Sequence, residues 1–81
     1  MTNDEIRTIV LVALKAIAPE FEASELLPDR PLRDQVDLDS MDWLNFLIGL
    51  HQRLQVDIPE ADYRKLTTLD ALVAYLAQKR V

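Results

Sequence analysis

Apolar residues recur at helical spacing in three separate stretches of this chain, and all four prolines fall between those stretches. In the first stretch they stand at Ile6, Ile9, Val10, Ala13, Leu14 and Ile17. Spacings of three and four residues line up on one face of an α-helix, and such a face is normally buried against other elements. No segment alternates apolar and polar residues for long enough to predict a sheet. The pattern therefore predicts an all-α fold.

Two long helices are expected, over residues 3–17 and 40–54. Thr2 and Glu5 form a capping-box signature at the start of the first helix, and Pro19 disfavours helical geometry at the residue before it. The second helix has an unusually wide apolar arc, because most of its positions are apolar. Its inward direction is predicted to pass through Trp43, Leu47, Leu50 and Leu54, which leaves Met41, Leu44 and Ile48 on one flank.

Residues 19–39 hold three of the prolines and no sustained period, so they predict a long loop with a short helical turn near residues 23–26. Pro59 is expected to be the first residue of a short third helix over residues 59–65.

The last helix is predicted to follow a second capping-box signature, formed by Thr67 and Asp70, and to run to about residue 79. The chain as a whole, residues 1–81, is then one domain. We expect a small four-helix bundle with a long loop between helices one and two and a short third helix.

The composition excludes most catalytic sites. The chain has no cysteine, one glycine and one histidine, which leaves no disulfide, thiol nucleophile, Gly-rich phosphate loop or zinc cluster. We therefore expect neither an enzyme nor a metal site, and we interpret the lone His51 as a partly buried structural imidazole.

Charge and hydropathy limit the partners and the location. A formal net charge of −5 disfavours nucleic acid and favours a basic partner. No stretch approaches the roughly 18 apolar residues of a membrane span. Asp4 and Glu5 precede the first apolar run and Lys15 interrupts it, which argues against a secretory signal. The expected location is the cytoplasm.

A serine stands at the junction of the long loop and the second helix. The unpaired N–H groups and the dipole of a helix N-terminus favour a phosphate there, so Ser40 is a candidate site for a phosphoester. Ser and Asp are also preferred helix caps, and on position alone Ser40 or Asp39 could be no more than the cap.

The motifs of the chain resemble those of the acyl carrier protein family over nearly its whole length. Asp39-Ser40-Met41 opens the second helix, Ile58-Pro59 precedes the third and Thr67-Thr68 opens the fourth, in the order and at the distances of that family. The resemblance implies that Ser40 carries 4′-phosphopantetheine, installed from coenzyme A by a phosphopantetheinyl transferase, with Asp39 and Met41 as its flanks. It further implies a stand-alone carrier, a monomer without catalytic activity, that presents acyl thioesters to loading and transferring enzymes.

In that family the second helix is the docking surface for partner enzymes. The resemblance places this surface at Asp42 and at the flank formed by Met41, Leu44 and Ile48, although Leu44 could equally belong to the core. Asp37 is expected to contribute to docking as well. Partners are expected to have basic docking surfaces.

The acidic residues depart from the pattern of the fatty-acid-synthesis members. Residues 20–42 hold eight acids against two arginines, whereas residues 43–54 carry Arg53 as their one charged residue, with histidine counted as neutral. Asp37 stands where the family often has a glycine. We therefore expect a dedicated carrier of a specialised lipid or secondary-metabolite pathway, within fatty acid or polyketide biosynthesis in the broad sense, rather than the housekeeping fatty-acid carrier.

The apolar core suggests a place for the cargo. An interior site lined by Phe46, Leu50, Ile58, Leu72, Val73 and Leu76 is predicted to shelter an acyl chain, because the elements around it are short or irregular. The alternative from another functional class is an unmodified helical adaptor domain that binds a protein through the same flank.

Overall fold

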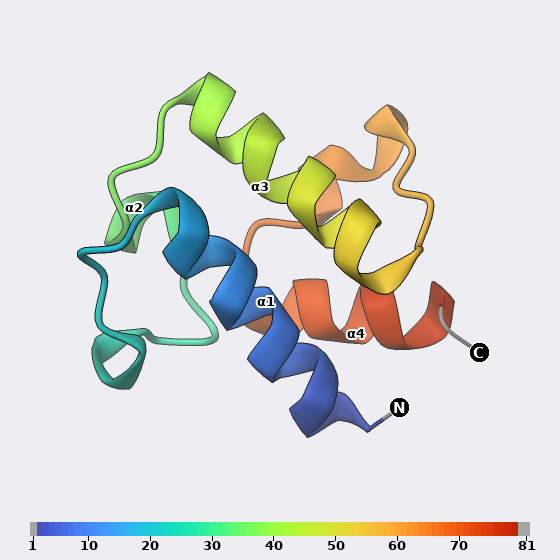
Figure 1. Cartoon of the computed structure of the whole chain (residues 1–81), viewed down its shortest axis with the longest axis horizontal. Coiled ribbons are helices and arrows are strands. Elements are labelled where there is room, and N and C mark those ends of the chain that lie inside the picture. The colour runs from blue at the N-terminus through green and yellow to red at the C-terminus, as the bar shows by residue number, and fades with distance from the viewer. Residues whose placement is uncertain (1, 80–81) are drawn as a thin grey trace.

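The computed structural model describes residues 2–79 and consists of three long helices joined by connections that contain short helical turns (Figure 1). The long helices are α1 (Asn3–Ile17), α3 (Ser40–Leu54) and α4 (Leu69–Lys79). Helix α1 packs against both α3 and α4. The short turns are η1 (Ala23–Glu25), α2 (Leu32–Gln35) and η2 (Glu60–Lys65). The predicted all-α fold with a short helix between the second and last long helices is confirmed.

Helix α1 begins and ends where its sequence signals predict. The backbone N–H of Glu5 donates to Thr2 Oγ1 at 3.2 Å, and the backbone N–H of Thr2 donates to Glu5 Oε1 at 3.1 Å. The capping box is therefore complete, and the hydrogen bonds that Thr2 donates to the Glu5 carboxylate from its backbone N–H and its hydroxyl lower the pKa of Glu5. The buried face of α1 consists of Ile6, Val10, Ala13 and Leu14.

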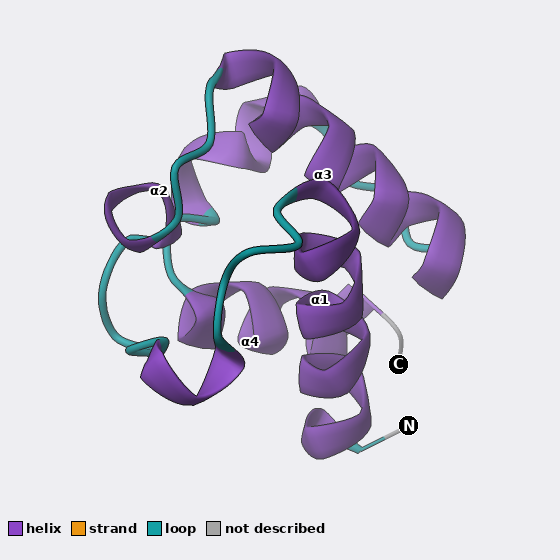
Figure 2. Cartoon of the chain, turned by 60° about the vertical axis from the view of Figure 1, so that its left-hand side comes forward, coloured by secondary structure: helices purple, strands orange, loops and turns teal. Residues whose placement is uncertain are grey.

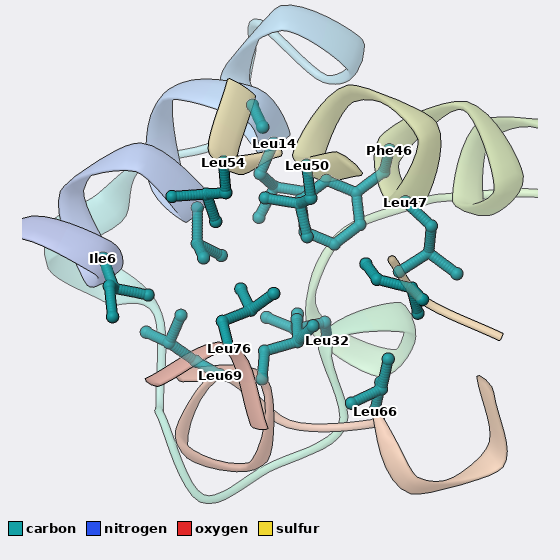
Figure 3. Packing of buried hydrophobic residues seen from close by; sticks show 14 of the residues in the cluster. Ile6, Leu14, Leu32, Phe46, Leu47, Leu50, Leu54, Leu66, Leu69 and Leu76 are labelled. Carbon is teal, nitrogen blue, oxygen red and sulfur yellow. The ribbon is translucent and has the colours of Figure 1, made fainter. Parts of the chain in front are cut away.

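Helix α3 has the predicted bounds, but its inward face is centred differently from the prediction. Phe46, Leu47, Leu50 and Leu54 are buried, whereas Trp43 is only half-buried. The close-up in Figure 3 shows Phe46 and Leu50 inside the core, near Leu14 of α1. When most positions of a helix are apolar, periodicity cannot fix the inward direction, and the packing partner decides it.

The connection between α1 and α3 contains a helical turn, α2, that the sequence pattern did not predict. Figure 2 shows this connection along one side of the molecule. Its anchor is Leu32, which is fully buried and whose N–H donates to the carbonyl of Thr67 at 2.8 Å. The side chain of Gln35 accepts from the N–H of Leu27 at 2.6 Å and donates to the carbonyl of the same residue at 2.8 Å. The long loop is thus fixed by tertiary contacts, and its first short turn, η1, lies where a turn was expected.

Two details of the second half of the chain differ from the sequence prediction. Pro59 is the cap of η2, which is a 3₁₀ helix, and not its first residue. The cap of α4 is Thr68 and not Thr67, because Thr68 Oγ1 accepts from the N–H of Ala71 at 3.0 Å. The carbonyl of Thr67 is occupied by the bond from Leu32, and Thr68 pairs with Pro31 in an isolated antiparallel bridge.

A hydrogen bond fastens η2 to α4. Tyr75 Oη donates to Asp62 Oδ2 at 2.6 Å, and Lys65 Nζ lies 3.6 Å from the other carboxylate oxygen. Burial, together with the hydrogen bond to the carboxylate, raises the pKa of Tyr75 to about 12. The same hydrogen bond lowers the pKa of Asp62 below its ordinary value.

Replacing Tyr75 with phenylalanine is expected to lower the melting temperature at neutral pH by a few degrees, because the hydrogen bond from Tyr75 to Asp62 is lost. The neutral phenol is favoured in the folded state, so its contribution is complete below pH 10 and is lost as the pH rises to about 12. The lowered pKa of Asp62 also stabilises the folded state; this stabilisation is present above pH 3.8 and is lost as the pH falls below that value. Melting curves of both chains across this pH range are the measurement. Tyr63→Phe is the matched control, and a Tyr75 effect that stays constant up to pH 12 would contradict the prediction.

Candidate functional site

The hydroxyl of Ser40 lies at the start of α3 and is not used to build the helix. Asp39 is the cap, because its Oδ1 accepts from the N–H of Asp42 at 2.7 Å. Ser40 is the first helical residue and is exposed, and its side chain makes no hydrogen bond within residues 2–79. The interpretation of Ser40 as a cap is therefore wrong, and Asp39 has that role.

This position suits a covalently attached phosphate. The first turn of α3 directs backbone N–H groups and the positive end of the helix dipole toward its N-terminus. Figure 1 shows the start of α3 at one edge of the molecule, at the end of the long connection. An exposed hydroxyl there can be reached by an enzyme and can accept a phosphoester without the loss of a native contact.

An apolar patch follows Ser40 along the outer face of α3. It consists of Met41, Leu44 and Ile48, whose exposed fractions are 65%, 38% and 44%. Leu44 thus lies at the surface and not in the core. The carboxylates of Asp37 and Asp39 are exposed beside the start of the helix, and Asp42 is half-buried. We call Met41, Leu44 and Ile48 the α3 patch.

The single histidine has a structural contact. His51 Nδ1 lies 2.7 Å from the carbonyl oxygen of Val56, and since a carbonyl can only accept, Nδ1 carries the proton. The contact joins the last turn of α3 to the segment that follows, although the residue is more exposed than expected. No group of three metal-ligating side chains lies together in the described part of the chain. No helix within residues 2–79 has the length and apolar character that crossing a bilayer requires.

The residues predicted to line an interior cargo site lie in the hydrophobic core. Phe46, Leu50, Leu72 and Leu76 are fully buried, Ile58 is 9% exposed and Val73 is half-buried against them. Ile58 also borders a small surface cavity of about 220 Å³, together with Ile48 and His51. Cargo that enters among the six residues has to separate side chains that are packed in this structure.

A surface pocket beside α3 was not predicted. Its volume is about 370 Å³, and its lining consists of Pro31, Arg33, Trp43, Tyr63, Arg64 and Thr67. Pro31 and Arg33 belong to the long connection and Trp43 to α3. Tyr63 and Arg64 belong to η2, and Thr67 lies between η2 and α4. Residues so far apart in the chain have no common period, so only the fold reveals that they meet.

The sequence model of the family described as "Phosphopantetheine attachment site" matches residues 4–76. The chain therefore belongs to the phosphopantetheine-binding carrier family. Phosphopantetheine is the group that members of this family carry, and they are carriers, not catalysts.

Curated relatives agree with this assignment. The chain is 29% identical to an acyl carrier protein of Streptomyces coelicolor over 75 residues, which cover 93% of this chain and 77% of the relative. An acyl carrier protein of Helicobacter hepaticus is 23% identical, with 93% and 92% covered. The meromycolate extension acyl carrier protein of Mycobacterium bovis is 31% identical, with 94% of this chain but only 65% of the relative covered.

Proposed function

We propose that this chain is an acyl carrier protein whose phosphopantetheine arm is attached to Ser40. The observation that carries the proposal is the exposed Ser40 hydroxyl at the N-terminus of α3, beside a cap that Asp39 provides. The flanks Asp39 and Met41 complete the attachment motif. Residues 1–81 act as one carrier domain, since the three long helices share one core.

Attachment is a group transfer that a partner enzyme catalyses. Ser40 Oγ forms one bond to the phosphorus that bears pantetheine in coenzyme A, and the bond from that phosphorus to the adenosine bisphosphate portion breaks. The hydroxyl proton passes to a base of the phosphopantetheinyl transferase. Once attached, the arm supplies the thiol that a chain without cysteine lacks. The carrier then presents the acyl group to successive enzymes at a high effective concentration.

The docking surface of the proposal combines charge and apolar area. Asp37, Asp39 and Asp42 attract basic partner enzymes, and the α3 patch provides the contact that persists in the complex. Net charge and exposed carboxylates of this kind do not attract nucleic acid. The carrier acts as a monomer in the cytoplasm in this proposal.

Replacing Ile48 with alanine is expected to weaken a complex with a loading or transferring enzyme about fivefold or more, with the fold intact, because the side chain is 44% exposed. Replacing Asp37 and Asp42 with asparagine is expected to lower the association rate and its dependence on salt. Surface plasmon resonance measures both effects, and Val12→Ala, an exposed change on α1, is the matched control. Unfolding of the Ile48→Ala chain would show that this side chain belongs to the core and would contradict the assignment.

The pathway of the proposal is a specialised one. Eight acids lie in residues 20–42, and helix α3 carries few charges beyond its first turn. A partner that recognises this distribution has its basic residues near the loop and the helix start, which separates it from partners of a carrier with acids along the helix. One relative bears the name meromycolate extension acyl carrier protein. We therefore propose lipid or secondary-metabolite biosynthesis.

Acyl chains are sheltered, in this proposal, among the six core residues named above. Each buried CH₂ contributes about 0.8 kcal/mol, so a chain of several carbons can offset the separation of packed side chains. The melting temperature is expected to rise with the length of the acyl chain attached to the arm and then to level off. Melting temperatures that are equal for all lengths would show that the cargo stays in solvent.

Intact mass spectrometry tests the carrier function directly. After incubation with coenzyme A and a broad-specificity phosphopantetheinyl transferase, the chain is expected to gain the mass of one phosphopantetheinyl group. An unchanged mass would support the alternative of an unmodified adaptor domain.

A further inference from the structure

Two arginines and two aromatic side chains meet in the pocket beside α3. Arg33, Arg64, Trp43 and Tyr63 line the cavity of about 370 Å³, which is near the lower end of the roughly 300–1,000 Å³ typical of small-molecule sites. The carrier function described above gives none of these four residues a role.

The positive charge of the two arginines is not neutralised within the described chain. Neither guanidinium forms an ion pair or a hydrogen bond in residues 2–79. Asp62, an acid on the same short helix as Arg64, is already engaged by Tyr75 and Lys65. Both arginines are exposed, and a pocket that they line together favours an anionic ligand even in a chain with a net charge of −5.

The backbone and rings around the pocket are held in place by separate contacts. Leu32, next to Arg33, is fully buried, and its N–H bond to Thr67 joins the two sides of the pocket. The ring of Trp43 lies 5.3 Å from that of Phe46, with which it packs at 43°. The bond between Tyr75 and Asp62 holds the segment that bears Tyr63 and Arg64. The backbone and the Trp43 ring of the site are therefore in place before a ligand arrives, and the exposed Arg33 and Arg64 side chains are free to turn toward it.

We propose that this pocket binds the end of a carboxylate-terminated acyl cargo. The carboxylate pairs with Arg33 and Arg64, and the apolar stem lies against the faces of Trp43 and Tyr63. The inference rests on the proposed carrier function and specifies the class of its cargo. A methyl-terminated chain lacks the anion and has no reason to prefer this pocket over the core.

The pocket lies within reach of the arm. Trp43 follows Ser40 by three residues on α3, so the two lie about 4.5 Å apart along the helix axis and on neighbouring parts of one face. A flexible arm attached to Ser40 can fold back over that distance and place its acyl end between η2 and the long connection.

Trp43 provides the readout, because it is the single tryptophan of the chain. The holo chain is loaded with a glutaryl or a pentanoyl group, which have equal numbers of carbons and differ in the terminal carboxylate. The glutaryl form is expected to shift the emission of Trp43, and the pentanoyl form is not. The Arg33→Gln/Arg64→Gln chain is expected to lose the shift, whereas Arg53→Gln, on an exposed residue that does not line this pocket, retains it.

A titration without the arm separates this inference from the carrier function. The N-acetylcysteamine thioester of glutarate is added to the unmodified chain, with the pentanoate thioester as the comparison. We expect about tenfold tighter binding of the glutarate compound, and loss of that difference in the double arginine variant. Absence of the arm from the mass spectrum would count against the carrier function, whereas this titration reports on the pocket alone.

Three results would overturn the inference. One is an equal response of Trp43 to glutaryl and pentanoyl groups. Another is a glutaryl response that the double arginine variant retains. A third is a shift that is already complete in the holo chain without cargo and is abolished by the double variant, since the arginines would then hold the phosphate of the arm.

Discussion

A chain in which Ser40 is replaced by alanine is expected to gain no phosphopantetheine under conditions that modify the wild-type chain completely. The reason is chemical, because the substitution removes the oxygen that would form the phosphoester. The fold is expected to survive, since Asp39 and not Ser40 caps α3. Intact mass spectrometry gives the extent of modification, and circular dichroism gives the helix content.

The matched control is Ser24→Ala. Ser24 is the other serine of the chain, is exposed and lies in the short turn η1, outside the start of a long helix. This variant is expected to be modified like the wild-type chain. Modification of the Ser40→Ala chain, or loss of modification in the Ser24→Ala chain alone, would contradict the assignment of the site.

Replacing Phe46 with alanine is expected to lower the free energy of unfolding by about 3–5 kcal/mol. Phe46 is fully buried on the inward face of α3, so the substitution removes apolar contacts and leaves a cavity that the three packed helices cannot easily close. The whole free energy of unfolding of a small domain is roughly 5–15 kcal/mol, and the variant is therefore expected to be partly unfolded at 37 °C.

Urea denaturation followed by circular dichroism measures this loss. Leu44→Ala is the control on the same helix, because Leu44 is 38% exposed, and it is expected to change the stability by less than about 1 kcal/mol. A similar loss for both variants would mean that α3 is turned differently about its axis, with the α3 patch in the core.

Helices α1 and α3 could be predicted to the residue, whereas the cap of α4 and the short helices could not. Helices α1 and α3 have signals at their starts and a sustained apolar period, and both have the predicted bounds. Helix α2 has four residues, too few for a period, and it depends on the burial of Leu32 and on the bond from Leu32 to Thr67, which is distant in the sequence. That bond is also the reason why the cap of α4 is Thr68, since two adjacent threonines offer the same local signal.

The candidate site could likewise be predicted only where its signal lies in neighbouring residues. The position of Ser40 followed from a local motif and from the start of a helix, which are both properties of neighbouring residues. The pocket with Arg33, Trp43 and Tyr63 combines three segments of the chain, and no spacing in the sequence brings them together. Trp43 shows the difficulty, since its place in a wide apolar arc predicted the core and the fold puts it at the edge of a pocket.

Asp39 caps α3 and Ser40 does not, and this has a consequence for the order of events after synthesis. Because the cap of α3 is the carboxylate of Asp39, which takes no part in the attachment, the hydrogen bond that caps the helix forms as soon as the chain has folded. Folding therefore does not have to wait for the arm, and the transferase meets a finished helix instead of a segment that it must order itself. Loss or replacement of the arm likewise leaves the scaffold intact, so one polypeptide can pass through many cycles of arm attachment and removal.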